Sequence, residues 1–230
     1  AGGASATPTQ LGIMAFGYAG TYPSGSYSAL SNLVSSSGVV ASDTAAVGTT
    51  RNSAAGAGYG GDLAIFGYGS GPLSVTNLVS NSGVVASDTT GVGTARESIA
   101  AANYGVDKAI FGFGSPTTAI TNLVSSSGVV ASDTAGVGTA RFALAGAEYG
   151  GDKAIFAFGH TGSITNISNL VNNSGVVTGD VAGVGTARYA LNAAGYGDDK
   201  AIYGFGRTPG ANGVTNLVSN TGVVAADVAA

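Results

Sequence analysis

The feature that most constrains this chain is a phrase of 22 residues that returns several times with little change. The copy from Gly138 to Gly159 reads GTARFALAGAEYGGDKAIFAFG. The other copies begin at Gly48, Gly93 and Gly185, and a shorter version, QLGIMAFGYAG, begins at Gln10. Self-similarity at a fixed period is the signature of a repeat architecture, in which each unit packs against its neighbours.

The period is about 45 residues, because the arginine of the phrase recurs at Arg51, Arg96, Arg141 and Arg188, with spacings of 45, 45 and 47. Four-stranded propeller blades have this length, and so do helical HEAT or armadillo repeats. Each unit is rich in Gly, Val, Thr and Ser and lacks a charged stripe of helical period. This composition favours strands.

The unit that begins at Gly138 is predicted to contain four strands. The first three are Arg141–Tyr149, Lys153–Phe158 and Ile167–Val171, and the fourth starts at Val176. The turn Gly150-Gly151-Asp152 joins the first two, and Gly and Asp tolerate the positive φ angles that hairpins require. The first two strands are apolar or small on both faces, as expected for strands covered on two sides.

We therefore predict an all-β fold, a five-bladed β-propeller forming one domain. The blades, here called units 1 to 5, span approximately residues 10–46, 47–91, 92–136, 137–183 and 184–230. Unit 1 lacks a clear inner strand, which residues 1–9 or another chain could supply, or which is missing. A stacked solenoid is the alternative, but it needs polar capping repeats.

The composition disfavours several classes of function. The net charge is −4 with only eight basic residues, so we expect no nucleic-acid partner, because phosphate binding needs clustered Lys and Arg. No apolar run approaches the roughly 20 residues of a membrane span, so we expect no membrane insertion. The absence of cysteine rules out disulfides and thiolate zinc sites.

The layout resembles the kelch family. In that family the first strand often opens with an arginine, a tight turn follows, and the second strand ends in a glycine doublet. The matching residues are Arg141, Gly150-Gly151 and the end of AIFAFG at Gly159, with Arg96, Gly105 and FGFG as a second set. FGFG replaces the doublet, and the usual Trp is absent. The Gly/Ala/Ser-rich units also look like kelch-like repeats in virion or fibre proteins of tailed bacteriophages.

The repeated charged residues are the first candidates for a role. Four aspartates each precede an arginine by eight residues, as Asp43–Arg51, Asp88–Arg96, Asp133–Arg141 and Asp180–Arg188. A ring of carboxylates could bind calcium. The alternative, which we favour, is that Asp caps a turn and Arg joins neighbouring blades through a bidentate pair. Asp227 would lack a partner under this pairing, unless Arg51 or a neighbouring subunit supplied one.

Catalysis is not expected, since His160 is the only histidine and a Ser-His-Asp triad or a zinc site needs more partners. We predict no enzyme activity, no cofactor and no metal. The loops after the second strands vary between units, as a recognition surface on a rigid scaffold would, although relaxed drift gives the same pattern. Four loop residues are predicted to contact a ligand: Tyr22, Tyr27, His160 and Arg207.

These features predict a structural or binding module of a virion, such as a tail fibre or capsid appendage, or of another extracellular assembly. Its partners would be protein subunits of that assembly or surface glycans, bound through one propeller face. The alternative is a soluble lectin with repeated sugar pockets between blades, lined by residues such as Tyr104, Tyr149 and Tyr196.

Overall fold

The computed structural model describes residues 10–21 and 24–229, without the side chains of residues 10 and 11. These residues form five antiparallel sheets of two to four strands and no helix, which confirms the all-β prediction. The strands are β1 (Gln10–Ala19) and β2 (Ser26–Ser35); β3 (Ala55–Tyr59), β4 (Leu63–Gly69) and β5 (Leu73–Val79); β6 (Ala100–Tyr104), β7 (Lys108–Gly114) and β8 (Thr118–Val124); β9 (Ala145–Tyr149), β10 (Lys153–His160) and β11 (Ile164–Val171); β12 (Asn192–Tyr196), β13 (Lys200–Gly204), β14 (Val214–Val218) and β15 (Val228–Ala229).

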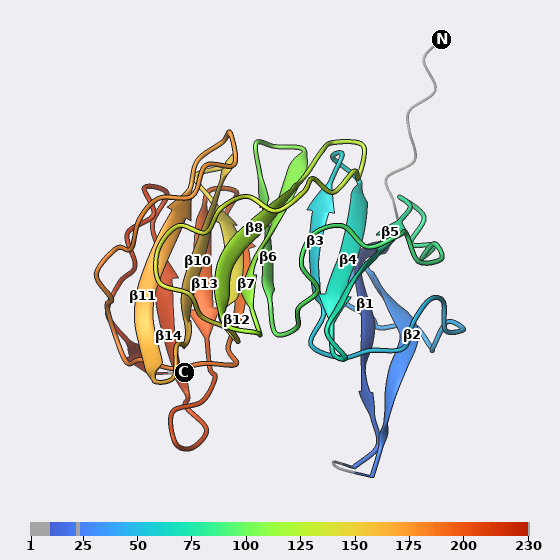
Figure 1. Cartoon of the computed structure of the whole chain (residues 1–230), viewed down its shortest axis with the longest axis horizontal. Coiled ribbons are helices and arrows are strands. Elements are labelled where there is room, and N and C mark those ends of the chain that lie inside the picture. Colours follow the sequence, from blue (N-terminus) through green and yellow to red (C-terminus); the bar gives the residue numbers. More distant parts are fainter. Residues whose placement is uncertain (1–9, 22–23, 230) are drawn as a thin grey trace.

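β1 and β2 lie at one end of the molecule, next to the sheet of β3, β4 and β5, and the last two sheets overlap in this view (Figure 1). Neighbouring sheets meet through their inner strands, so that β3 contacts β6, β6 contacts β9 and β9 contacts β12. No closed ring is seen in the part of the chain that the structure describes. The described residues also contain no helix long and apolar enough to cross a membrane.

Strand bounds in unit 4 differ from those predicted. The first strand begins at Ala145 rather than Arg141, because Ala143 has a φ of 51° and interrupts the extended chain. Phe142 instead forms an isolated bridge with His160, and the second strand extends to His160, which pairs with Ile164 of the third strand. The third strand begins at Ile164, three residues earlier than expected.

The predicted fourth strand is reduced to isolated bridges in units 1 to 4. In unit 4 these bridges join Val171 to Val177 and Ser168 to Val181. The side chain of Asn169 interrupts the ladder, since its Nδ2 donates to the Thr178 carbonyl and to Asp180 Oδ1. A side-chain amide thus replaces part of the backbone ladder. In unit 5 the fourth strand is present as β15.

The core consists of three apolar clusters, each between two neighbouring sheets. Small residues of the inner strands lie next to one another, and larger rings fill the space beside them. Three equivalent aromatic residues of the second strands, Phe111, Phe156 and Tyr203, are completely buried. Each of these clusters therefore joins one unit to the next.

The last unit ends the row with an uncovered face. Residues of β12 are mostly exposed, whereas the equivalent strands β6 and β9 alternate between buried and half-buried positions. Phe205 is 57% exposed, although its counterparts Phe113 and Phe158 are completely buried. No sheet of the described residues packs on this side of unit 5.

Candidate functional site

Units 2 to 5 each contain one completely buried arginine, Arg51, Arg96, Arg141 and Arg188 respectively. Arg96 shows the most complete set of contacts. Its Nε donates to the Phe113 carbonyl at 2.8 Å, its Nη1 to the Thr94 carbonyl at 2.9 Å and its Nη2 to Asn122 Oδ1 at 2.5 Å. Buried charges are tolerated when hydrogen bonds satisfy them in this way. We call this arrangement the arginine socket.

An aspartate completes each socket, but it is not the one predicted from the eight-residue spacing. Asp133 lies 3.9 Å from Arg96, which precedes it by 37 residues, and Asp88 lies at the same distance from Arg51. The ion pairs therefore join residues of one unit, at a distance too long for a bidentate pair. The prediction that these aspartates pair with the arginine that follows them is wrong.

Each socket aspartate is held mainly by hydrogen bonds. Asp133 accepts from the backbone N and Oγ1 of Thr94 and from Asn122 Nδ2. Burial alone would raise the pKa of Asp133, but these hydrogen bonds and the charge of Arg96 outweigh it and lower the pKa below 3.8. The carboxylates of the sockets are ionised at neutral pH.

Asp227 is not without a partner. It accepts from the backbone N and Oγ1 of Thr186 and from Asn216, and lies 4.0 Å from Arg188. Neither Arg51 nor a second subunit is needed, so that hypothesis is wrong. Of the five aspartates that recur at this position, from Asp43 to Asp227, Asp43 is the one for which the described residues show no arginine. Its hydrogen-bond partner is Asn32.

The arginines do join neighbouring units, but through rings and backbone rather than through carboxylates. Each guanidinium lies over an aromatic ring of the preceding unit, at 3.7 to 4.3 Å from the ring centre. The ring residue has a φ near 60°, and the glycine after it donates its N–H to the arginine carbonyl. The pairs are Arg51 on Phe16, Arg96 on Tyr68, Arg141 on Phe113 and Arg188 on Phe158.

The aspartates of the hairpin turns form separate local contacts. Asp107, Asp152 and Asp199 each pair with the lysine that follows, and Asp62 accepts from Asn81. Among the described residues, no three His, Asp or Glu side chains gather closely enough to hold a metal ion. The repeated carboxylates therefore lie apart from one another, one to each socket or turn.

A second arrangement lies along the edge where the second and third strands meet. Directly after each arginine, one residue pairs with the end of the second strand in its own unit. We call these four pairs the rim. They are Asn52 with Ser70, Glu97 with Ser115, Phe142 with His160 and Tyr189 with Arg207.

The rim is most aromatic between units 4 and 5. The His160 ring lies 5.2 Å from the ring of Phe142 and 5.6 Å from the ring of Tyr189, measured between ring centres. All three side chains are half-buried, and Arg207 beside them is exposed. The structure thus brings the predicted contact residues His160 and Arg207 together.

The other two predicted contact residues are not part of this arrangement. Tyr27 is exposed in unit 1, at the far end of the row, where its ring packs edge-on against Tyr18. Tyr22 lies outside the described residues. For the lectin alternative, Tyr104 and Tyr149 are buried at 3% and 4% exposure, so their rings are not available to a sugar.

Sequence reasoning missed Phe142 and Tyr189, although the signal was present. The residue after each arginine is the one that changes most within an otherwise constant phrase, being Asn52, Glu97, Phe142 or Tyr189. The predicted contact residues were chosen only from the loops, so this position was not among them. The fold places it opposite the variable residue at the end of the second strand.

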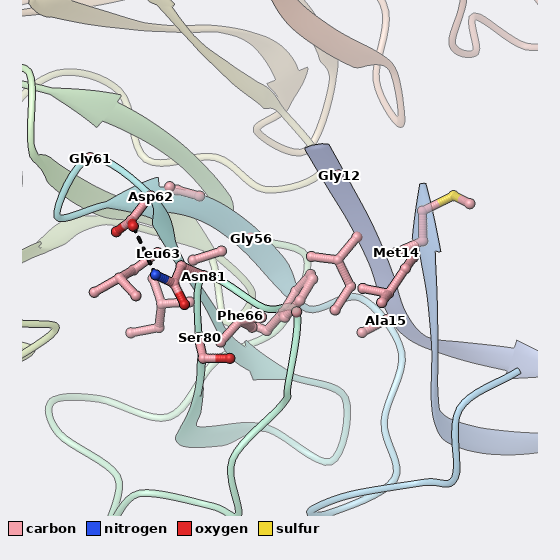
Figure 2. A pocket seen from close by; sticks show the side chains of 18 residues that line it. Gly12, Met14, Ala15, Gly56, Gly61, Asp62, Leu63, Phe66, Ser80 and Asn81 are labelled. Atoms are coloured by element: carbon pink, nitrogen blue, oxygen red, sulfur yellow. Dashed lines mark hydrogen bonds between the residues drawn. The ribbon is translucent and has the colours of Figure 1, made fainter. Parts of the chain in front are cut away.

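A cleft of about 750 Å³ separates the sheets of units 1 and 2 (Figure 2). Met14 and Ala15 of β1 lie on one side of it, and Gly56 and Phe66 on the other. It follows the edge of β1 that pairs with no other described strand. In units 2 to 5 an inner strand lies at this position, and the segment suggested for unit 1, residues 1–9, is outside the described residues.

Comparisons with known proteins give a fold and no family. No family model and no curated protein matches the sequence. The fold is similar to a solved structure described as a novel fungal alcohol oxidase with catalytic diversity among the AA5 family, in complex with copper. The TM-score is 0.54 at 11% identity, over 94% of this chain and 62% of that one. The chain therefore spans less than two thirds of that structure's length.

This similarity contradicts the prediction that the chain is not an enzyme, because an oxidase uses the same fold. At such low identity the similarity shows the fold alone. The residues present do not fit copper, which favours imidazole and thiolate ligands. The sequence has one histidine and no cysteine, and the acidic side chains that the structure describes are dispersed.

Proposed function

We propose that this chain is a binding module whose rim recognises a surface glycan or a protein. One observation supports this most directly: the position that differs most between near-identical units, directly after the arginine, lies on the rim. The arginine and the aromatic residues of the cores repeat almost unchanged in units 2 to 5, as expected for parts that only hold the units together. A constant framework with a varied edge is the usual arrangement of a recognition surface.

The chemistry of the rim suits such a role. Between units 4 and 5 it presents Phe142, His160 and Tyr189 next to the exposed guanidinium of Arg207. Aromatic residues and Arg are enriched at the centres of protein interfaces, where they contribute most of the binding energy. Flat rings beside a charged donor also suit a sugar with a carboxylate, which Arg binds in a bidentate manner.

We also propose that the chain folds as a kelch-like five-bladed propeller. Five sheets in a row and one stacked arginine between each pair of units support it. A place in a virion or another extracellular assembly also remains our proposal for this module, with protein subunits or surface glycans as its partners.

The test uses residues that the chain itself provides. Unit 2 has Asn52 and Ser70 where unit 4 has Phe142 and His160, so Phe142→Asn with His160→Ser keeps a pair that this backbone already accepts. Purified wild-type chain and this double variant are compared on a glycan array. We expect the wild type to bind a limited set of glycans, and the variant to lose this binding by about tenfold or more.

Two further measurements complete the test. Tyr189→Asn with Arg207→Ser should weaken binding in the same way, and Asp107→Asn, on an exposed turn, serves as the control. Equal binding by the wild type and both rim variants would refute the rim as the recognition site. If the wild type binds no glycan on the array, a glycan partner is refuted and a protein surface remains the proposed partner.

A further inference from the structure

The arginine socket also exists in unit 1, where the described residues supply no arginine. Asn32 holds the same place as Asn77 and Asn122, since its Nδ2 donates to the Ala41 carbonyl at 3.1 Å and to Asp43 Oδ1 at 2.8 Å. In unit 2 the matching bonds from Asn77 are 3.0 and 2.9 Å. The amide therefore has the orientation that, in units 2 and 3, turns its Oδ1 toward a guanidinium.

The backbone part of the socket is in place as well. The register of β1 with β2 shifts between Ala15 and Gly17, just as β7 with β8 shifts between Gly112 and Gly114. Phe16 thus corresponds to Phe113, whose carbonyl accepts from Arg96 Nε. Phe16 also has the same left-handed backbone, with a φ of 64° against 62° for Phe113.

These groups surround a hollow of about 230 Å³. It is lined by β1 and β2 and includes Phe16, Gly17, Asn32 and Asp43. A Cβ placed on Gly69 would meet the Cδ of Arg51 at 2.8 Å, and one on Gly114 would meet that of Arg96 at 3.2 Å, but one on Gly17 would have no atom within 4 Å. Among the described residues, none fills in unit 1 the space that an arginine stem fills in units 2 and 3.

Residues 1–50 contain neither Arg nor Lys. The arginines of units 2 to 5 are fully buried in their own sockets. Among the described residues, no threonine binds the carboxylate of Asp43, whereas Thr49 binds Asp88 through its backbone N and Oγ1.

We propose that the unit 1 socket binds an extended peptide segment with the sequence Thr-x-Arg, presented by a partner polypeptide. The guanidinium donates to Asn32 Oδ1 and to the Phe16 carbonyl and faces Asp43. The threonine donates its N–H and hydroxyl to the Asp43 carboxylate. In unit 3, Thr94 and Arg96 make this whole set of contacts within one chain, and in the proposed complex the same contacts are made between chains. The site is separate from the rim, so either proposal can fail without the other.

The test is a titration of the full 230-residue chain with acetyl-Gly-Thr-Ala-Arg-amide, followed by calorimetry and by NMR of side-chain amides. We expect saturable binding that shifts the Asn32 amide signals. Replacing the arginine of the peptide by citrulline, which has a similar shape but no charge, should weaken binding by about tenfold or more. Replacing its threonine by alanine should weaken binding by about threefold to tenfold.

Variants of the chain locate the site. Asp43→Asn should weaken binding by about tenfold, whereas Asp107→Asn, with the same change of charge on a distant turn, should bind as the wild type does. Circular dichroism checks that both variants are folded, and the citrulline comparison on the wild type holds even if one is not. Any of three results would overturn the proposal: no saturable binding, equal affinity for the citrulline peptide, or full affinity in folded Asp43→Asn.

Discussion

At the scale of single residues, the repeats act as an internal set of controls. The central residue of the hairpin turn has a positive φ in units 2 to 5, and it is Gly61, Val106, Gly151 or Asp198. Glycine adopts this conformation freely, whereas a β-branched residue is strained there. Val106 is also 77% exposed, so packing does not compensate for the strain.

Val106→Gly is therefore expected to stabilise the protein, by about 0.5–1 kcal/mol, because the relief of strain exceeds the entropy lost by glycine. Urea denaturation of the wild type and the variant measures the change. Gly151→Val is the matched reverse substitution and should destabilise by about 1–2 kcal/mol. A loss of stability in Val106→Gly would show that the valine makes a contact that outweighs its backbone strain.

The buried arginines should tolerate no conservative replacement. Arg96→Lys keeps the charge but cannot donate to Phe113, Thr94 and Asn122 together, so acceptors are left without donors. We expect a loss of about 2–4 kcal/mol in the free energy of unfolding. Arg207→Lys on the exposed rim is the control and should change stability by less than about 0.5 kcal/mol. Equal effects of the two substitutions would contradict the structural role of the socket.

The sequence identified the arginines and aspartates as structural residues but not their pairing, for a simple reason. Asp88 lies eight residues before Arg96 and 37 residues after Arg51, and similar intervals recur along the chain, the second being 37 residues in units 2 and 3 and 39 in units 4 and 5. Periodicity cannot distinguish these two partners. Only the fold, which returns the fourth segment to the beginning of its own unit, makes the choice.

At the scale of elements, units 2 to 5 each contain a side-chain latch between an aspartate and a threonine, and in units 2 to 4 it takes the place of a full fourth strand. The aspartate of the returning segment binds the threonine ahead of the arginine, as Asp180 binds Thr139. The composition predicted the strands, but it did not predict these hydrogen bonds between aspartate and threonine. An asparagine in a strand pattern gives no sign that its amide will replace backbone hydrogen bonds.

The latches predict a particular sensitivity to acid. The pKa values of Asp88, Asp133, Asp180 and Asp227 are below the ordinary value in the folded chain. The stability they add is complete above the unfolded pKa of about 3.9 and is lost as the pH falls through the folded values. Unfolding followed by fluorescence between pH 6 and pH 2 should show this loss. Asp133→Asn should lessen the pH dependence, and an unchanged profile would argue against ionised latches.

At the scale of the whole molecule, the described sheets form a row with two different ends. Interior units are covered on both sides, whereas units 1 and 5 are each covered on one. In such a row, stability is approximately the sum of unit and interface contributions, so the ends open more easily than the middle. The number of units and their order were predictable from the sequence. Whether the row closes depends on packing between distant units, which a repeated sequence does not encode.

Hydrogen exchange measures this gradient directly. Amides of β7 and β10 are expected to be the most protected, and those of β12 and β1 to exchange at least about tenfold faster. The comparison uses the native chain near neutral pH, with fragments analysed by mass spectrometry. Uniform protection along the row would show that the terminal faces are covered in solution, by ring closure or by another copy.

Met14 is the only methionine of the chain, and it is 52% exposed beside both the cleft and the unit 1 socket. A thioether in such a place is open to oxidation, and the resulting sulfoxide adds 16 Da to a single known residue. The protein therefore carries its own chemical footprinting probe. The rate at which dilute peroxide converts Met14 should report whether anything covers this end of the row, in the test tube or in an intact assembly.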